Sequence, residues 1–205
     1  MKQKKEIKAV ISDIGGVMVL GDNMKTHYLP LIKSLKIDNI EFFKTYEKYV
    51  DKASRGKMTA KQMISFMAND LKINKEKLLK NWIKFKKKSV KKNYELEKIY
   101  KNLKKNYVLG SMSGVLDLHY QLFNEKYIYN IFKFNIYSFK VGWNKPDLQI
   151  YKLLLKKLKL SPKEVLFIDD NPICLTPAKK LKINTIQFKN NKQLIKDLKK
   201  FNIKI

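Results

Sequence analysis

The chain leaves its first predicted strand through the stretch Val10-Ile11-Ser12-Asp13-Ile14-Gly15-Gly16-Val17. This stretch closes an apolar run over residues 7–12, which ends abruptly at an acid followed closely by two glycines. A buried strand that runs into a glycine-rich turn has this pattern. An acid at the end of a buried strand needs a partner, so Asp13 is the first candidate for a functional residue.

Residues 22–93 carry a helical pattern and no convincing strand. Leu29, Ile32 and Leu35 recur at three-residue steps, as on one face of a helix. Thr59 has the position of an N-cap for a further helix, and residues 75–87 predict another. We therefore expect this part of the chain to be all helical.

After Asn93 the pattern alternates between helix and strand. Short apolar runs predict strands at residues 107–112, 136–139, 165–168 and 185–188, and helical patterns are found at 94–104, 148–158 and around 178–181. Strands separated by helices indicate a parallel sheet with helices on both faces. The sequence therefore predicts an α/β core, residues 1–20 and 94–205, interrupted by a helical insertion at residues 21–93.

Residues able to do chemistry stand close to the ends of the predicted strands. Asp13 follows the first strand, Ser113 the second, and Asp169 and Asp170 a later one, while Lys145 lies on a loop before the helix that precedes the aspartate pair. In an open parallel sheet, ligands bind outside the carboxyl ends of the strands. Carboxylates, a hydroxyl and an ammonium at that edge suit phosphoryl transfer, in which an enzyme mainly positions groups and neutralises charge.

Four segments, in this order, resemble the motifs of the haloacid dehalogenase-like (HAD) hydrolase superfamily. They are residues 10–17, 107–113, 145–151 (Lys-Pro-Asp-Leu-Gln-Ile-Tyr) and 165–170, which end in or contain the residues named above. The position of the helical insertion is similar to the cap of the subfamily typified by small-metabolite phosphatases and 2-haloacid dehalogenases. The resemblance covers essentially the whole chain. It implies a Rossmann-like three-layer α/β core with a mostly parallel sheet, plus an inserted all-helical cap.

The resemblance also implies a nucleophile and a metal site. Asp13 would attack phosphorus and form an aspartyl-phosphate, which is a form of covalent catalysis. Magnesium would be bound by Asp13, the backbone carbonyl of Gly15 and Asp169, with Asp170 as a ligand either directly or through a water molecule. Oxygen ligands of this kind suit a hard cation.

A second group of residues would bind the substrate. By the same resemblance, Ser113 would hydrogen-bond the transferring phosphoryl group, with Gly114 beside it. Lys145 would neutralise the crowded carboxylates and the developing charge on phosphorus. The expected substrate and partner is a small phosphorylated metabolite.

The chain departs from the family's pattern at several positions. Many family phosphatases carry a second aspartate as general acid and base where this chain has Gly15. Such assistance is typically worth about 10²–10⁴ in rate, so we expect weak or narrowly selective activity. Gly114 stands where relatives often have asparagine. Pro177 lies where a helix is usual, so we expect Thr176 to cap that helix, Pro177 to fill its first turn and a longer loop to follow Asp170.

The formal net charge of +27 comes from 45 Lys and Arg against 18 Asp and Glu. The basic residues are nearly all lysine, spread over every predicted helix, and Arg55 is the only arginine. Dedicated nucleic-acid binders rely on arginine to contact phosphates and bases bidentately. We therefore interpret the charge as a compositional bias on solvated faces and expect no nucleic-acid partner.

The expected location is the cytoplasm. Cys174 is the only cysteine, so no intrachain disulfide is possible. No apolar run approaches the roughly 20 residues of a membrane-spanning helix, and we expect no membrane association. The basic N-terminus and the apolar stretch 9–21 imitate a secretory signal, but Asp13 interrupts the stretch and no small-x-small cleavage site follows.

Two other functions stay open at this point. A dehalogenase would share the nucleophilic aspartate but attack carbon without a metal. Such enzymes resemble Asp-x-Tyr-Gly-Thr in the first motif and use an arginine for the substrate carboxylate or halide, whereas this chain has Gly-Gly-Val, and Arg55 lies far along the insertion. A binding module that has lost catalysis is the other alternative, and Gly15, Gly114 and Pro177 keep it open.

Overall fold

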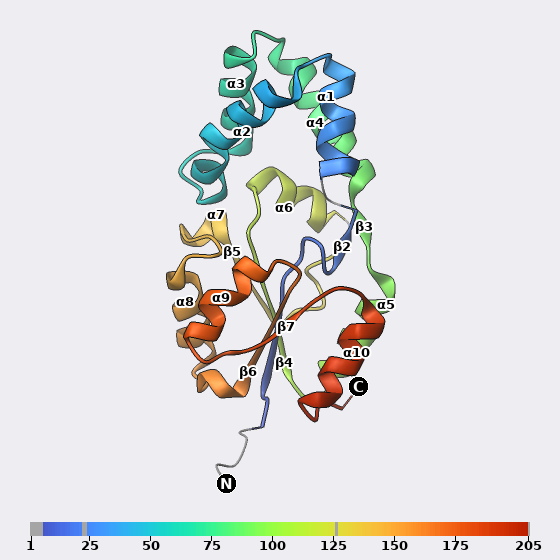
Figure 1. The fold of residues 1–205 in the computed structure, drawn as a ribbon, viewed down its shortest axis with the longest axis vertical. Helices are drawn as coiled ribbons and strands as arrows, with labels where there is room; N and C mark the ends of the chain where they lie inside the picture. Colours follow the sequence, from blue (N-terminus) through green and yellow to red (C-terminus); the bar gives the residue numbers. More distant parts are fainter. Residues whose placement is uncertain (1–5, 22–23, 126, 205) are drawn as a thin grey trace.

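The computed structural model describes residues 6–21, 24–125 and 127–204. Residues 1–5 of the predicted core and 22–23 of the predicted insertion lie outside these ranges. A five-stranded sheet forms the centre, in the order β5-β4-β1-β6-β7, and all neighbouring strands run parallel (Figure 1). The strands are β1 (Ala9–Ser12), β4 (Val108–Ser113), β5 (Phe134–Tyr137), β6 (Val165–Asp169) and β7 (Asn184–Gln187). The predicted fold class, α/β with a parallel sheet, is confirmed.

Helices cover both faces of this sheet. The helices of the core are α5 (Tyr94–Leu103), α6 (Asp117–Asn124), α7 (Ser138–Val141), α8 (Leu148–Leu158), α9 (Pro172–Lys180) and α10 (Asn191–Lys200), with a 3₁₀ turn η2 (Pro162–Glu164). Side chains alternate along the fully buried strand β1. Val10 therefore packs with α5 and α10, and Ile11 packs with α8 and α9 on the other face. The core has three layers, with β1 in the middle of the sheet.

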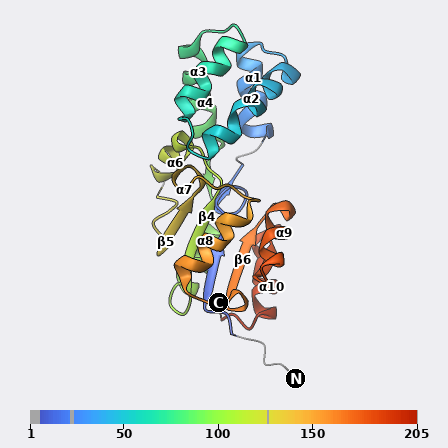
Figure 2. The ribbon, with the colours of Figure 1, turned by 90° about the vertical axis from the view of Figure 1, so that its left-hand side faces the viewer.

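A group of helices, here called the cap, stands beyond the carboxyl end of the sheet (Figure 2). It consists of a π-helical turn η1 (Met24–Tyr28), α1 (Leu29–Leu35), α2 (Asn39–Ser54), α3 (Ala60–Asp70) and α4 (Lys75–Ser89). Thr59 caps α3 as predicted, and its hydroxyl accepts the N–H of Gln62 at 3.1 Å. The cap's apolar cluster includes Leu116 and Leu118, so the cap packs directly on the start of α6.

The expectation that the insertion contains no strand is wrong at its end. Lys91–Lys92 form β3, which pairs antiparallel with β2 (Val19–Leu20). The backbones that leave and re-enter the core run side by side there, and pairing satisfies their peptide groups without help from the side chains. Periodicity therefore gave no signal for these two-residue strands.

The structure differs from the sequence-based expectations in two further ways. The predicted strand 136–139 is found at Phe134–Tyr137, because Ser138 already begins the short helix α7. Helices α6 and α10 were not predicted, although both bury apolar side chains. Within the described residues, no helix has both the length and the apolarity that crossing a membrane requires.

The expected long loop after Asp170 is absent, and Pro177 does not lie in a first turn. Helix α9 begins at Pro172, with Asn171 as N-cap, and Pro177 lies inside it. The side chain of Asn171 accepts the N–H of Ile173 at 3.0 Å, so the cap motif comes five residues earlier than expected. Thr176 is not the cap, since its hydroxyl donates to the carbonyl of Pro172 at 3.3 Å. Asp170 is therefore held close to the helix start.

We expect Trp82→Ala to destabilise the fold strongly. Trp82 is fully buried in the cap, and its Nε1 donates to Nε2 of His119 in α6 at 2.9 Å. Burial lowers the pKa of His119 well below its ordinary value, so the imidazole stays neutral and can accept. Loss of the indole leaves a cavity and should cost about 3–5 kcal/mol of unfolding free energy in urea denaturation. The matched control Trp143→Ala removes a tryptophan that is 43% exposed; an equal loss there would contradict the prediction.

Candidate active site

Asp13 lies at the carboxyl end of the central strand. Its N–H donates to the carbonyl of Ile168 at 2.8 Å, so the parallel ladder continues up to the acid. Its Oδ1 accepts the N–H of Ile14 at 2.6 Å and lies 2.8 Å from Nζ of Lys145. The residue is only 8% exposed. The acid therefore has the partners that its burial requires.

Lys145 joins two of the predicted carboxylates. Its Nζ lies 2.8 Å from Oδ1 of Asp13 and 2.6 Å from Oδ2 of Asp169, the last residue of β6. The other oxygen of Asp169 accepts the N–H of Asn171 at 2.9 Å. Burial alone would lower the pKa of Lys145, but Asp13 and Asp169 outweigh burial and raise it, so the ammonium stays charged.

The carboxyl of Asp13 is less acidic than usual. Burial, with help from the charge of Asp169, raises the pKa of Asp13 to about 7, although Lys145 and the N–H of Ile14 act in the opposite direction. The protonated form of a carboxyl is a poor nucleophile. A further cation beside it would favour the ionised form.

Asp13, Asp169 and Asp170 form a cluster that suits a metal ion. Each offers a carboxylate oxygen, and these oxygens all lie within 4.8 Å of one another. When all three are ionised, the ammonium of Lys145 balances one charge and leaves two, which a divalent cation matches. Burial and the charge of Asp169 raise the pKa of Asp170. An all-oxygen donor set of this charge fits Mg²⁺.

Glycines allow two loops to approach this cluster closely. Gly16 has φ of +72°, and a Cβ there would collide with the carboxylate of Asp170. Gly114 follows Ser113, the buried last residue of β4, and a Cβ there would collide with Oδ1 of Asn144. Gly15 is different, because a Cβ at that position would meet nothing within 4 Å. The turn after Asp13 therefore has room for a side chain at Gly15.

The structure brings the predicted site residues together at the carboxyl edge of the sheet. Ser12 in β1 pairs with Ser111 in β4 and with Ile168 in β6, so Ser113 and Asp169 end near Asp13. Lys145 reaches the same edge from its loop. The roles of these residues, and of the Gly15 carbonyl as a ligand, stay predictions.

A hollow of about 320 Å³ opens between the cap and the core, beside Gly114. Its cap side includes Tyr28 and Tyr46, whose hydroxyls are hydrogen-bonded at 2.9 Å, and its core side includes Asn144. Most of these groups can both donate and accept hydrogen bonds.

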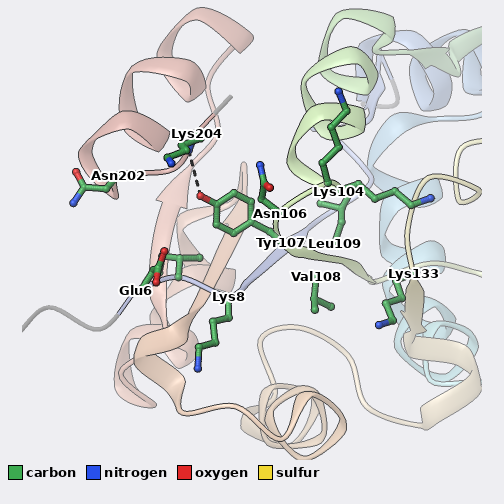
Figure 3. A pocket seen from close by; sticks show the side chains of 12 residues that line it. Glu6, Lys8, Lys104, Asn106, Tyr107, Val108, Leu109, Lys133, Asn202 and Lys204 are labelled. Atoms are coloured by element: carbon green, nitrogen blue, oxygen red, sulfur yellow. Dashed lines mark hydrogen bonds between the residues drawn. The ribbon is translucent and has the colours of Figure 1, made fainter.

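A second hollow, of about 730 Å³, lies at the opposite end of the sheet (Figure 3). Lys8 and Val108, at the amino ends of β1 and β4, line it together with Lys104, Lys133 and Lys204. It is separated from Asp13 by the length of β1. It is therefore not part of the carboxylate site, although it is the larger of the two.

Sequence reasoning missed two residues that support the site. Asn171 holds Asp169 through its N–H, and its place directly after the aspartate pair was the available signal. Arg55, in the cap, donates from Nη1 and Nη2 to the carboxylate of Asp147, which belongs to the third motif. Its signal was that it is the only arginine in the chain.

The structure thus combines a parallel α/β core, a carboxylate–lysine site at the carboxyl edge of its sheet and a helical cap beyond that edge. The family model described as haloacid dehalogenase-like hydrolase matches residues 23–188, and the chain belongs to this family. Among curated proteins it is similar to bifunctional epoxide hydrolase 2 of Sus scrofa, with 44% identity over 69 residues. That match covers 34% of this chain and 12% of the relative, and a 42% identical match to the Mus musculus protein has the same extent.

Solved structures share the fold across nearly the whole chain. The HAD family enzyme BT-2542 from Bacteroides thetaiotaomicron has a TM-score of 0.79 at 21% identity, covering 90% of this chain and 95% of that one. Its complex with magnesium and inorganic phosphate has a TM-score of 0.71 at 21% identity, covering 89% and 94%. A 2-haloacid dehalogenase from Pseudomonas syringae pv. Tomato DC3000 has a TM-score of 0.67 at 14% identity, covering 89% and 86%.

Proposed function

We propose that this hydrolase is a magnesium-dependent phosphatase that cleaves a small phosphomonoester through an aspartyl-phosphate on Asp13. The observation that carries the proposal is the position of the Lys145 ammonium, 2.8 Å from Asp13 and 2.6 Å from Asp169, with Asp170 in the same carboxylate cluster. The complex of the similar BT-2542 enzyme with magnesium and inorganic phosphate supports it. The proposed partner is a small phosphorylated metabolite.

In the proposed reaction a carboxylate oxygen of Asp13 attacks phosphorus, and the bond between phosphorus and the leaving-group oxygen breaks. The leaving oxygen takes its proton from water, because Gly15 offers no acid. Water then attacks the aspartyl-phosphate, which releases inorganic phosphate and restores the carboxylate. The protein is therefore unchanged after one complete turnover.

The site must neutralise the negative charges of its carboxylates and of the phosphoryl group. Lys145 and the Ser113 hydroxyl would stabilise the charge on the phosphoryl oxygens. Asp13, Asp169, Asp170 and the carbonyl of Gly15 would hold magnesium, which when bound supplies positive charge to the phosphoryl group and to Asp13. With that charge the pKa of Asp13 falls, and the nucleophile is ionised at neutral pH.

The contacts of Arg55 do not favour the dehalogenase alternative. Its guanidinium is bound to the carboxylates of Asp51 and Asp147. A 2-haloacid would have to displace one of these carboxylates to gain the arginine. The polar hollow beside Gly114 instead suits the hydroxyl-bearing leaving group of a phosphomonoester.

The proposal is tested with a panel of small phosphomonoesters, assayed with magnesium, after chelation, and after magnesium is added back. We expect turnover that falls by more than about tenfold on chelation and returns with magnesium, because the carboxylate cluster needs a divalent cation. Release of halide from a 2-haloacid without metal would replace the proposal by a dehalogenase. Absence of turnover on both panels would favour a binding module that has lost catalysis.

A further inference from the structure

We infer that Arg55 is a positioning residue that ties the cap to the loop carrying Lys145. The group of contacts is here called the cap latch and consists of Ser54, Arg55, Asn144 and Asp147. Only its kinetic consequence rests on the proposed function. The contacts themselves belong to the fold, and they can be tested without a substrate.

Arg55 holds two carboxylates from different parts of the molecule. It follows the last residue of α2, and its Nε donates to Oδ1 and Oδ2 of Asp51 in the same helix at 2.8 and 3.0 Å. Its Nη1 and Nη2 donate to the carboxylate of Asp147 in the core, the second at 3.2 Å. Arg55 lowers the pKa of Asp147, so this partner stays ionised. Only a guanidinium can serve two carboxylates in this way, because its donors point in different directions in one plane.

Two neighbouring contacts close the same junction. Nδ2 of Asn144 donates to Oγ of Ser54 at 3.1 Å, which joins the core loop to the end of α2. Gly56 has φ of +71°, and a Cβ there would collide with the carbonyl oxygen of Phe139 in α7. The turn after α2 therefore lies with its backbone directly against the core. A cap that moved away would break all of these contacts together.

The core side of the latch holds the backbone of Lys145. Oδ2 of Asp147 accepts the N–H of Asn144 at 3.1 Å, and Oδ1 of Asn144 accepts the N–H of Lys145 at 2.9 Å. The same Asp147 carboxylate thus binds Arg55 and shapes the turn from which Lys145 extends. The Lys145 ammonium then lies between Asp13 and Asp169. The carboxylate of Asp147 therefore couples closure of the cap to the position of the Lys145 ammonium.

Because of this arrangement, Lys145 is held in its catalytic position only while the cap is closed on the core. When Arg55 leaves Asp147, the turn loses a charged partner and Lys145 has more freedom to leave its two carboxylates. Enzymes often complete their catalytic constellation on closure of a lid, and the latch supplies the contacts for that step here. The hollow beside Gly114 includes residues of the cap latch, since Ser54 and Asn144 both line it.

The first test is hydrogen exchange measured by mass spectrometry on the whole protein without substrate. Arg55→Gln should speed exchange in peptides covering residues 142–148 by about tenfold while leaving β6 unchanged. Arg55→Lys keeps the positive charge but loses the planar guanidinium. Its exchange rate in residues 142–148 should lie between those of the wild type and Arg55→Gln. The control Lys48→Gln breaks the Lys48–Asp70 ion pair at 2.8 Å, which lies wholly within the cap, and should leave residues 142–148 unchanged. Equal exchange in Arg55→Gln and the wild type would overturn the latch.

The second test is kinetic and includes a double-mutant cycle. With a phosphomonoester that the wild type hydrolyses, Arg55→Gln should lower kcat about tenfold and change KM less than about twofold, because Lys145 acts on charge that develops after binding. Asp147→Asn should give the same loss, and the double variant no further loss. Faster exchange with unchanged kcat would overturn the positioning role. If Arg55→Gln exchanges faster but the wild type hydrolyses no phosphomonoester, the cap latch is supported and the proposed function is wrong.

Discussion

Asp13→Asn is expected to reduce magnesium-dependent phosphomonoester hydrolysis by a factor on the order of 10⁴ or more, as removal of a covalent nucleophile does elsewhere. The amide oxygen has lost the negative charge that attacks phosphorus, and it is also a weaker magnesium ligand than a carboxylate. Steady-state assays measure the loss. A short reaction quenched in acid and followed by peptide mass analysis should show a phosphorylated Asp13 peptide in the wild type and none in the variant.

A matched control for this exchange is Asp38→Asn. The Asp38 side chain accepts the N–H of Glu41 at 3.0 Å and caps α2, far along the cap sequence from the carboxylate cluster. Asparagine is an equally good N-cap, so both stability and activity should stay near those of the wild type. If Asp13→Asn keeps more than about a tenth of the wild-type rate, covalent catalysis by Asp13 is excluded, because loss of a nucleophile is never that mild.

Gly15→Asp is expected to increase hydrolysis of alkyl phosphates, by about 10² at the lower end of what general acid–base catalysis provides. The turn has room for the change, since a Cβ at Gly15 meets nothing within 4 Å and the backbone there is not left-handed. The new carboxyl would lie two residues from the nucleophile. From there it could protonate the leaving oxygen and later take a proton from the attacking water.

The gain should depend on the leaving group. An alkyl alkoxide needs a proton as it leaves, whereas nitrophenolate is stable without one, so the increase should be much smaller with p-nitrophenyl phosphate. Gly15→Ala adds the Cβ without the acid and should not raise the rate with either substrate. An equal increase in the alanine variant would mean that backbone restriction, not acid–base catalysis, is the cause.

The parallel sheet and the meeting of most of the candidate site residues could be predicted from the sequence, because each rests on a local pattern. The apolar run before Asp13 had to be buried on both faces, and a parallel sheet brings the ends of such strands to one edge. Accordingly, Lys145 forms ion pairs with both Asp13 and Asp169. That Asp170 belongs to the same cluster follows from its place next to Asp169.

The features that could not be predicted depend on contacts between distant segments. Strand β3 exists because the chain returns beside β2, and neither lysine in it favours a strand. Helix α9 starts at Pro172 with Asn171 as its N-cap, whereas Thr176 was the cap expected from the sequence. The ion pair of Arg55 with Asp147 joins residues whose spacing carries no pattern.

The central place of β1 has a consequence for how the chain acquires its structure. Ala9 pairs with Val108 on one side and with Val165 on the other, so β1 leaves the ribosome well before either of the strands that pair with it. Contacts within the cap are local by comparison, and local contacts form fast while distant strand pairings are slow. The cap helices can therefore collapse before the sheet closes around the strand that leads to Asp13.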